Sequence, residues 1–126
     1  MKWKLPVSVK FDITPIPDTL LEAVDLIVKS LTAEEVAFIQ GESDHAMLHH
    51  TVGMAMRNGW QLWQRGTALH EHFRDTYGLG HADDMSGLIM AGVWARVRGE
   101  EHDVERQVKR YKKHWTDAGE DPLMEK

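Results

Sequence analysis

The chain contains no cysteine, and this absence excludes disulfide bonds, thiolate metal ligands and thiol nucleophiles. Long hydrophobic runs are also missing, because the longest apolar stretch, residues 87–95, is far too short to cross a bilayer. The basic start of the chain, residues 1–6, is not followed by an apolar run of signal-peptide length. We therefore expect a soluble, cytoplasmic protein without a membrane partner.

Basic charge is in short supply as well. The 126 residues include 15 Lys and Arg against 20 Asp and Glu, and the net charge of −5 argues against a general nucleic-acid binder. A basic run at residues 109–113 has an aromatic residue inside it, as nucleic-acid patches often do. Because Tyr111 belongs to the apolar stripe of a predicted helix and acidic residues precede the run, we expect no nucleic-acid partner.

An alternating pattern opens the chain. Apolar and polar residues alternate strictly over residues 3–13, which predicts a β-strand with one buried face. Pro6 cannot donate a ladder hydrogen bond and favours an edge position. We expect residues 1–14 to form a strand extension that pairs either with irregular backbone of its own chain or with the same strand of a second copy. The second arrangement predicts a homodimer joined by an intermolecular ribbon.

Helical patterns and helix caps follow the strand, and we expect residues 15–118 to form a single helical domain. Helices should begin near residues 19, 32, 44, 67, 84 and 100, with a capping box at residues 32–35 and glycine after the ends at residues 59 and 78. Gly87, Ala91 and Ala95 lie four apart and give one helix a smooth face that a neighbour can approach closely. The fold class is therefore all-α, a compact bundle of five to six helices, with residues 119–126 as a flexible tail.

Two polar blocks, residues 49–63 and 80–86, carry the candidate site. Arg57 precedes Asn58 and Gly59 in the first block, and Asp83 and Asp84 open a helix in the second. Three interpretations of Arg57 stay open: a buried ion pair with Asp83 or Asp84 that fixes the fold, a cation at a helix C-terminus, or a contact to a phosphate or carboxylate ligand. Trp60 and Trp63 share one face of a helical turn and would supply packing or a stacking platform.

Histidines in the same region raise the question of a metal. His45 and His49 lie four apart on a predicted helix, and His81 with Asp83 could complete a shell around zinc or iron. No glutamate lies between the two histidines as in the zinc-protease helix motif. We expect polar surface or capping roles for these residues, and neither a metal nor a cofactor.

The two blocks resemble an uncharacterised family of small bacterial and phage proteins, a domain of unknown function. The likeness covers about residues 18–98, includes the helix near residues 19–31, and implies a small helical fold without naming an activity. In the first block the similar residues are His49 or His50, Gly53, Met54, Arg57, Asn58, Leu62 and Trp63. In the second block they are His81, Asp83, Asp84, Met85 and Ser86.

We expect a non-enzymatic binding or interaction module of bacterial or phage origin, which sequesters a small anionic ligand or blocks a partner protein. Arg57 would supply the charge, the tryptophans stacking, and the aspartates orientation. The site residues are Arg57, Asn58, Trp60, Trp63, His81, Asp83 and Asp84. One alternative is a metal-dependent hydrolase that uses His45, His49, His81 and Asp83. Another treats both blocks as structural and assigns partner binding to the N-terminal strand and the last helix.

The homodimer prediction has a direct test. Deleting residues 1–13 removes the whole alternating segment, so the shortened chain should lose the dimer and have half the mass of the full chain in solution. Light scattering coupled to gel filtration measures this mass, and an unchanged mass would rule out the ribbon.

Overall fold

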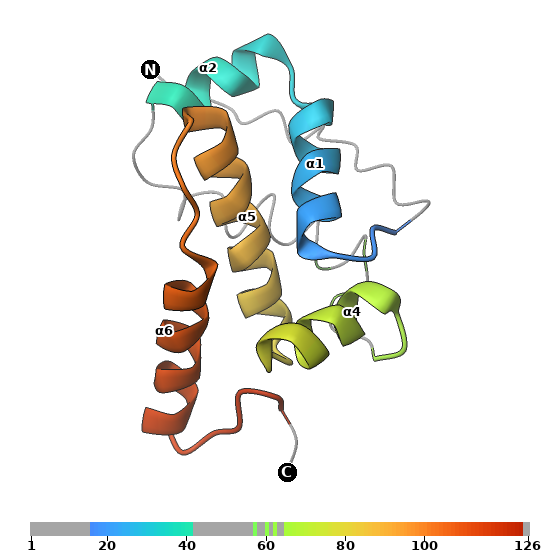
Figure 1. Cartoon of the computed structure of the whole chain (residues 1–126), viewed down its shortest axis with the longest axis vertical. Helices are drawn as coiled ribbons and strands as arrows, with labels where there is room; N and C mark the ends of the chain where they lie inside the picture. Colours follow the sequence, from blue (N-terminus) through green and yellow to red (C-terminus); the bar gives the residue numbers. More distant parts are fainter. Residues whose placement is uncertain (1–15, 42–56, 58–59, 61, 63–64, 125–126) are drawn as a thin grey trace.

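The fold is a set of helices arranged around one long helix, α5, at Ala82–Arg98. The computed structural model describes residues 16–41, 57, 60, 62 and 65–124. In these residues α1 (Leu20–Ser30) and α2 (Ala33–Gly41) pack against α5. Helix α4 (Ala68–His72) continues into a π-helical turn, η2 (Phe73–Tyr77), and α6 (Val104–Asp117) follows α5. Figure 1 shows α5 in the centre, with α1 on one side and α6 on the other.

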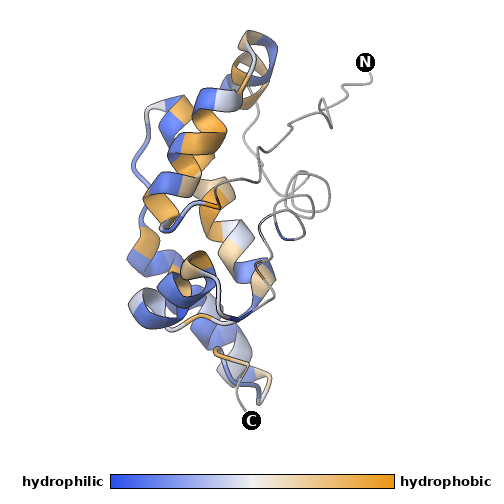
Figure 2. Ribbon diagram, turned by 90° about the vertical axis from the view of Figure 1, so that its right-hand side faces the viewer, coloured by the Kyte–Doolittle hydropathy of each residue, from blue (hydrophilic) through white to orange (hydrophobic). Residues whose placement is uncertain are grey.

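Burial of α5 on nearly every side defines the core. Residues 84–90 and 92–95 of this helix are all buried, whereas a surface helix buries only one stripe. Leu88, Ile89 and Val93 belong to one hydrophobic cluster, which also includes Trp60, Leu62, Phe73 and Leu79. Hydrophobic residues gather on the upper helices of Figure 2, and polar residues predominate toward the C-terminus.

Two glycines of α5 lie where neighbours approach most closely. A Cβ atom on Gly92 would lie 2.7 Å from Cγ2 of Val24 in α1, and a Cβ atom on Gly87 would collide with the hydroxyl of Tyr111 in α6. Glycine costs a helix roughly 1 kcal/mol relative to alanine, so the close packing of α1 and α6 offsets that loss here. The small-residue face expected from the sequence is confirmed at Gly87, and Gly92 was not anticipated.

Local capping explains the first helices. The Thr19 side chain accepts a hydrogen bond from the Glu22 amide at 3.2 Å and begins α1. Thr32 and Glu35 form the predicted capping box, because the Glu35 amide donates to the Thr32 hydroxyl at 3.1 Å and the Thr32 amide donates to the Glu35 carboxylate at 2.7 Å.

The helix expected from Thr67 to Gly78 is confirmed in its ends but not in its regularity. Thr67 is the N-cap of α4, and Gly78 ends η2 with a left-handed φ of 70°. Between them the chain changes to π-helical hydrogen bonding at Phe73–Tyr77. Such wide turns are rare and are often found at functional sites.

Two predicted helix starts are wrong by a few residues. The N-cap of α5 is His81 rather than Asp83 or Asp84, because both aspartates lie in the first helical turn. The last helix begins at Val104, where Asp103 caps it by accepting from the Arg106 amide, and not near Glu100. The N-terminal strand and the helix from residue 44 to Asn58 lie outside the described residues, apart from Arg57, which is helical.

The segment after α6 contacts the turn that precedes α5. The Gly80 amide donates to the Pro122 carbonyl at 2.8 Å, and Arg74 donates to the Leu123 carbonyl at 2.8 Å. A Cβ atom on Gly80 would lie 2.6 Å from the Leu123 carbonyl carbon, so only glycine permits this approach. Flexibility of residues 119–126 stays a prediction. In the part of the chain described here, no helix has the length and apolar character that a membrane span needs.

Candidate functional site

Arg57 and the start of α5 meet in space, although 26 positions separate Arg57 from Asp83 along the chain. Nε of Arg57 lies 3.2 Å from Oδ1 of Asp83, and Nη1 donates a hydrogen bond of 2.9 Å to the hydroxyl of Ser86. The Ser86 hydroxyl donates in turn to the Asp83 carbonyl at 3.0 Å. The Arg57 guanidinium therefore holds the side chains of Asp83 and Ser86, and with them the first turn of α5, in place.

The burial of these groups is unequal. The Arg57 side chain is 12% exposed and the Asp83 side chain is 68% exposed, whereas Ser86 is completely buried. Water screens the charge of Asp83, so the inner contact to Ser86 should matter more for stability than the outer ion pair. Of the three interpretations of Arg57, this geometry favours the pair that fixes the fold.

The other residues of the predicted site lie in different surroundings. Trp60 is completely buried and belongs to the core, so it has no exposed face on which a ligand could stack. Asn58 and Trp63 lie outside the described residues. The backbone near them is tied to α4, because the Leu62 amide donates to the Arg57 carbonyl and His70 Nδ1 donates to the Leu62 carbonyl at 2.6 Å.

Asp84 faces α6 and not Arg57. Its carboxylate is buried and accepts a hydrogen bond of 2.7 Å from the indole nitrogen of Trp115. Burial raises the pKa of Asp84, and the indole hydrogen bond partly opposes this rise by stabilising the charged form. Successive helix residues point about 100° apart, which explains why the two aspartates serve different neighbours.

His81 contacts the same Trp115 side chain as Asp84 does. Its ring stacks on Trp115 with centroids 3.7 Å apart and planes 7° apart, and its Nε2 donates to the Asp121 carbonyl at 2.9 Å. His81 therefore joins α6 and the C-terminal segment to the turn before α5. Trp115 and Asp121 were absent from the predicted site, because no spacing in the sequence links residues 30 or 40 positions apart.

The metal alternative loses support at two of its four residues. Asp83 pairs with Arg57, and His81 is held between Trp115 and Asp121. His45 and His49 lie outside the described residues. Among the residues the structure does describe, no group of three or more His, Cys, Asp or Glu side chains could hold a metal ion.

The model of a family described as a domain of unknown function (DUF6794) matches residues 16–97, which is more than half of the chain and includes both polar blocks. No curated protein and no solved structure matches the chain.

The Arg57 arrangement predicts an order of mutational effects. Arg57→Ala removes the buried contact to Ser86 and should lower the free energy of unfolding by roughly 1–3 kcal/mol. Asp83→Ala removes only the exposed partner and should cost at most about 1 kcal/mol. Urea denaturation followed by circular dichroism measures both. Equal losses, or a larger loss in the Asp83 variant, would contradict the fold-fixing role of the inner contact.

Proposed function

We propose that this chain, which belongs to the family of the domain of unknown function DUF6794, is a non-enzymatic interaction module of bacterial or phage origin that binds an acidic partner protein through α6. The observation that carries the proposal is the exposed basic face of α6 on a chain whose net charge is −5. Such a charge asymmetry steers a partner of opposite charge to one surface. We place the module in the cytoplasm.

Little of helix α6 is buried. Its buried residues are Gln107 and Val108, and five basic residues stand against two acidic ones along it. Arg106, Lys109 and Arg110 are exposed and occupy positions i, i+3 and i+4, so they share one face. Lys113 extends this face but pairs with Asp117 at 2.6 Å. We call Arg106, Lys109 and Arg110 the basic triad; within the described residues, none of its members is in an ion pair.

The aromatic residues of α6 favour a protein partner over a nucleic acid. Single-stranded nucleic acids are bound by stacking bases on exposed aromatic side chains as well as by charge. Trp115 already stacks on His81, and the Tyr111 hydroxyl accepts a hydrogen bond of 2.7 Å from Gln107. Within the described residues, Trp115 and Tyr111 are thus already engaged inside the fold, and the basic triad is suited to carboxylates on a partner surface.

This proposal follows the interpretation that treats the two polar blocks as structural. Arg57 is engaged by Asp83 and Ser86, so a small anion would have to compete with both. Because α6 lies beyond the matched residues 16–97, the family match covers the helices up to α5 and does not cover the basic triad. A homodimer through the N-terminal strand stays part of the proposal and does not involve α6.

Binding to a polyglutamate peptide of about twenty residues tests the proposed surface. The full chain should bind this peptide at low ionic strength, and replacing the basic triad by Arg106→Gln, Lys109→Gln and Arg110→Gln should weaken binding roughly tenfold or more. Lys29→Gln, which removes an exposed basic charge from α1, is the matched control and should bind as the unchanged chain does. Fluorescence anisotropy of the labelled peptide gives the dissociation constants.

Two outcomes would overturn the proposal. The first is equal binding by the triad and Lys29 variants, which would mean that α6 is not the contact surface. The second is tighter binding of a DNA duplex than of the peptide at the same ionic strength, which would assign the face to nucleic acid.

A further inference from the structure

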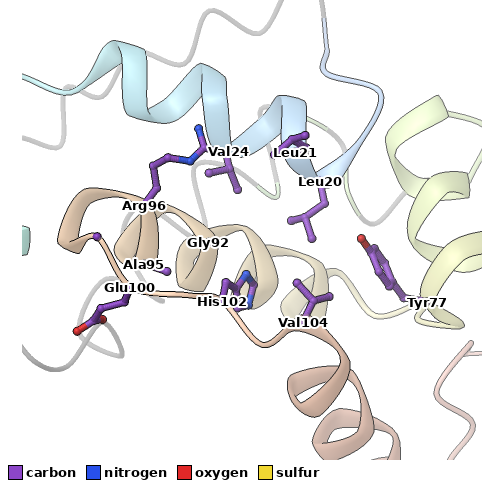
Figure 3. Close-up of a pocket in the computed structure, with 11 residues that line it drawn as sticks. Leu20, Leu21, Val24, Tyr77, Gly92, Ala95, Arg96, Glu100, His102 and Val104 are labelled. Carbon is purple, nitrogen blue, oxygen red and sulfur yellow. The ribbon is translucent and has the colours of Figure 1, made fainter.

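A cavity of about 470 Å³ lies beside α5, and none of its lining residues belongs to the two polar blocks or to the basic triad. Its walls come from α1, η2, α5, the α5–α6 connection and the first residue of α6. The volume falls within the roughly 300–1,000 Å³ that is usual for small-molecule sites. Figure 3 shows α1 along one side of the cavity and α5 along the other.

Most of the cavity wall is apolar. Leu20 and Val24 of α1 face Ala95 of α5, and Val104 lies at the start of α6. Gly92 forms part of the floor, where the absence of a side chain leaves room for Val24 on one side and the His102 ring on the other. A ligand in this position would therefore bury an apolar body against aliphatic side chains.

Two polar groups, a phenol and an imidazole, line this apolar space from different parts of the chain. The Tyr77 hydroxyl points from η2 toward the space between Leu20 and Val104, as Figure 3 shows. It has no hydrogen-bond partner among the residues that the structure describes. Burial raises the pKa of Tyr77, so the phenol keeps its proton and can donate.

The second polar group is Nδ1 of His102, and the neighbouring residues indicate which ring nitrogen of His102 acts as the donor. The Gln107 amide nitrogen donates to the Tyr111 hydroxyl, so the Gln107 carbonyl oxygen is left to accept from Nε2–H of His102 at 2.6 Å. A neutral His102 then carries its lone pair on Nδ1, which lies 3.4 Å from where a Gly92 Cβ would be. Within the described part of the chain, this nitrogen has no partner and is available as an acceptor.

Charge at the rim is already compensated. Arg96 forms an ion pair with Asp25 of α1, and Glu100 pairs with Arg98 at 3.4 Å. The hydrogen bond from Arg96 holds the pKa of Asp25 below its usual value, so this carboxylate stays charged beside the guanidinium. A charged ligand would lose its hydration in this apolar cavity, and the charges of opposite sign at the rim are already paired with each other.

From these groups we infer that the cavity between α1, η2 and α5 binds a small uncharged alcohol or phenol, whose hydroxyl accepts from the Tyr77 hydroxyl, while His102 Nδ1 offers a second polar contact elsewhere in the wall. The apolar body of the ligand lies against Leu20, Val24 and Val104. This site is independent of the basic triad, so either proposal can fail without the other.

Two probes of similar size and different charge test the ligand class. Titration of the full chain with 2-naphthol, followed by protein NMR shifts, should give saturable binding with shifts at Tyr77 and His102. The anionic 2-naphthoate carries the same ring system and should bind at least about tenfold more weakly. No binding of 2-naphthol, or equal or tighter binding of 2-naphthoate, would overturn the inference.

Three variants locate the site. Tyr77→Phe keeps the ring contacts to His72 and Phe73 but removes the donor, and it should weaken 2-naphthol binding roughly threefold to tenfold. Val104→Trp fills the cavity and should abolish binding. Glu101→Gln changes an exposed side chain next to His102 but outside the cavity, and it should leave binding unchanged. Unchanged binding in the folded Tyr77→Phe variant would place the ligand elsewhere and contradict the site.

Discussion

The fold depends on one helix being buried on almost all sides. α5 can take this central position because Gly87 and Gly92 let Tyr111 and Val24 approach its backbone, and because its first turn is held by polar contacts from two directions. Bulkier residues at either glycine would push α1 or α6 outward. The cavity beside Gly92 and the orientation of α6 both follow from this constraint, so the two proposed binding surfaces share one structural origin.

The first turn of α5 shows how polar residues specify a helical packing. Arg57 takes Asp83 and Ser86 on one side, while Asp84 accepts from Trp115 on the other. An alternative packing that broke one of these buried contacts would leave a polar group without its partner. The contacts therefore specify this packing more by destabilising the alternatives than by stabilising the native state. The His81–Trp115 stack and the carbonyl of Asp121 extend the arrangement to the C-terminal segment. Residues that resemble a catalytic cluster in the sequence thus have structural partners in space.

The sequence allowed prediction where the decisive interaction is local. Thr19, the Thr32–Glu35 capping box and Gly78 are readable because each cap depends on residues within one turn. The pairing of Arg57 with an aspartate of the second block could also be anticipated, but not which one, because that depends on the rotation of α5 against its neighbours. Trp115, the contact at Gly80 and the π-helical turn that positions Tyr77 escaped prediction, since they depend on tertiary contacts or on backbone geometry without a sequence signature.

The central position of α5 is tested most directly by a double-mutant cycle at its contact with α6. Gly87→Ala places a methyl group against the Tyr111 hydroxyl, so it should lower the free energy of unfolding by about 1–3 kcal/mol although alanine favours helices. In a Tyr111→Phe background, where the hydroxyl is absent, most of this loss should disappear. Gly41→Ala, in α2 where a Cβ meets no atom within 4 Å, serves as the control. A Gly87→Ala chain that is more stable than the unchanged protein would contradict the close packing of α5.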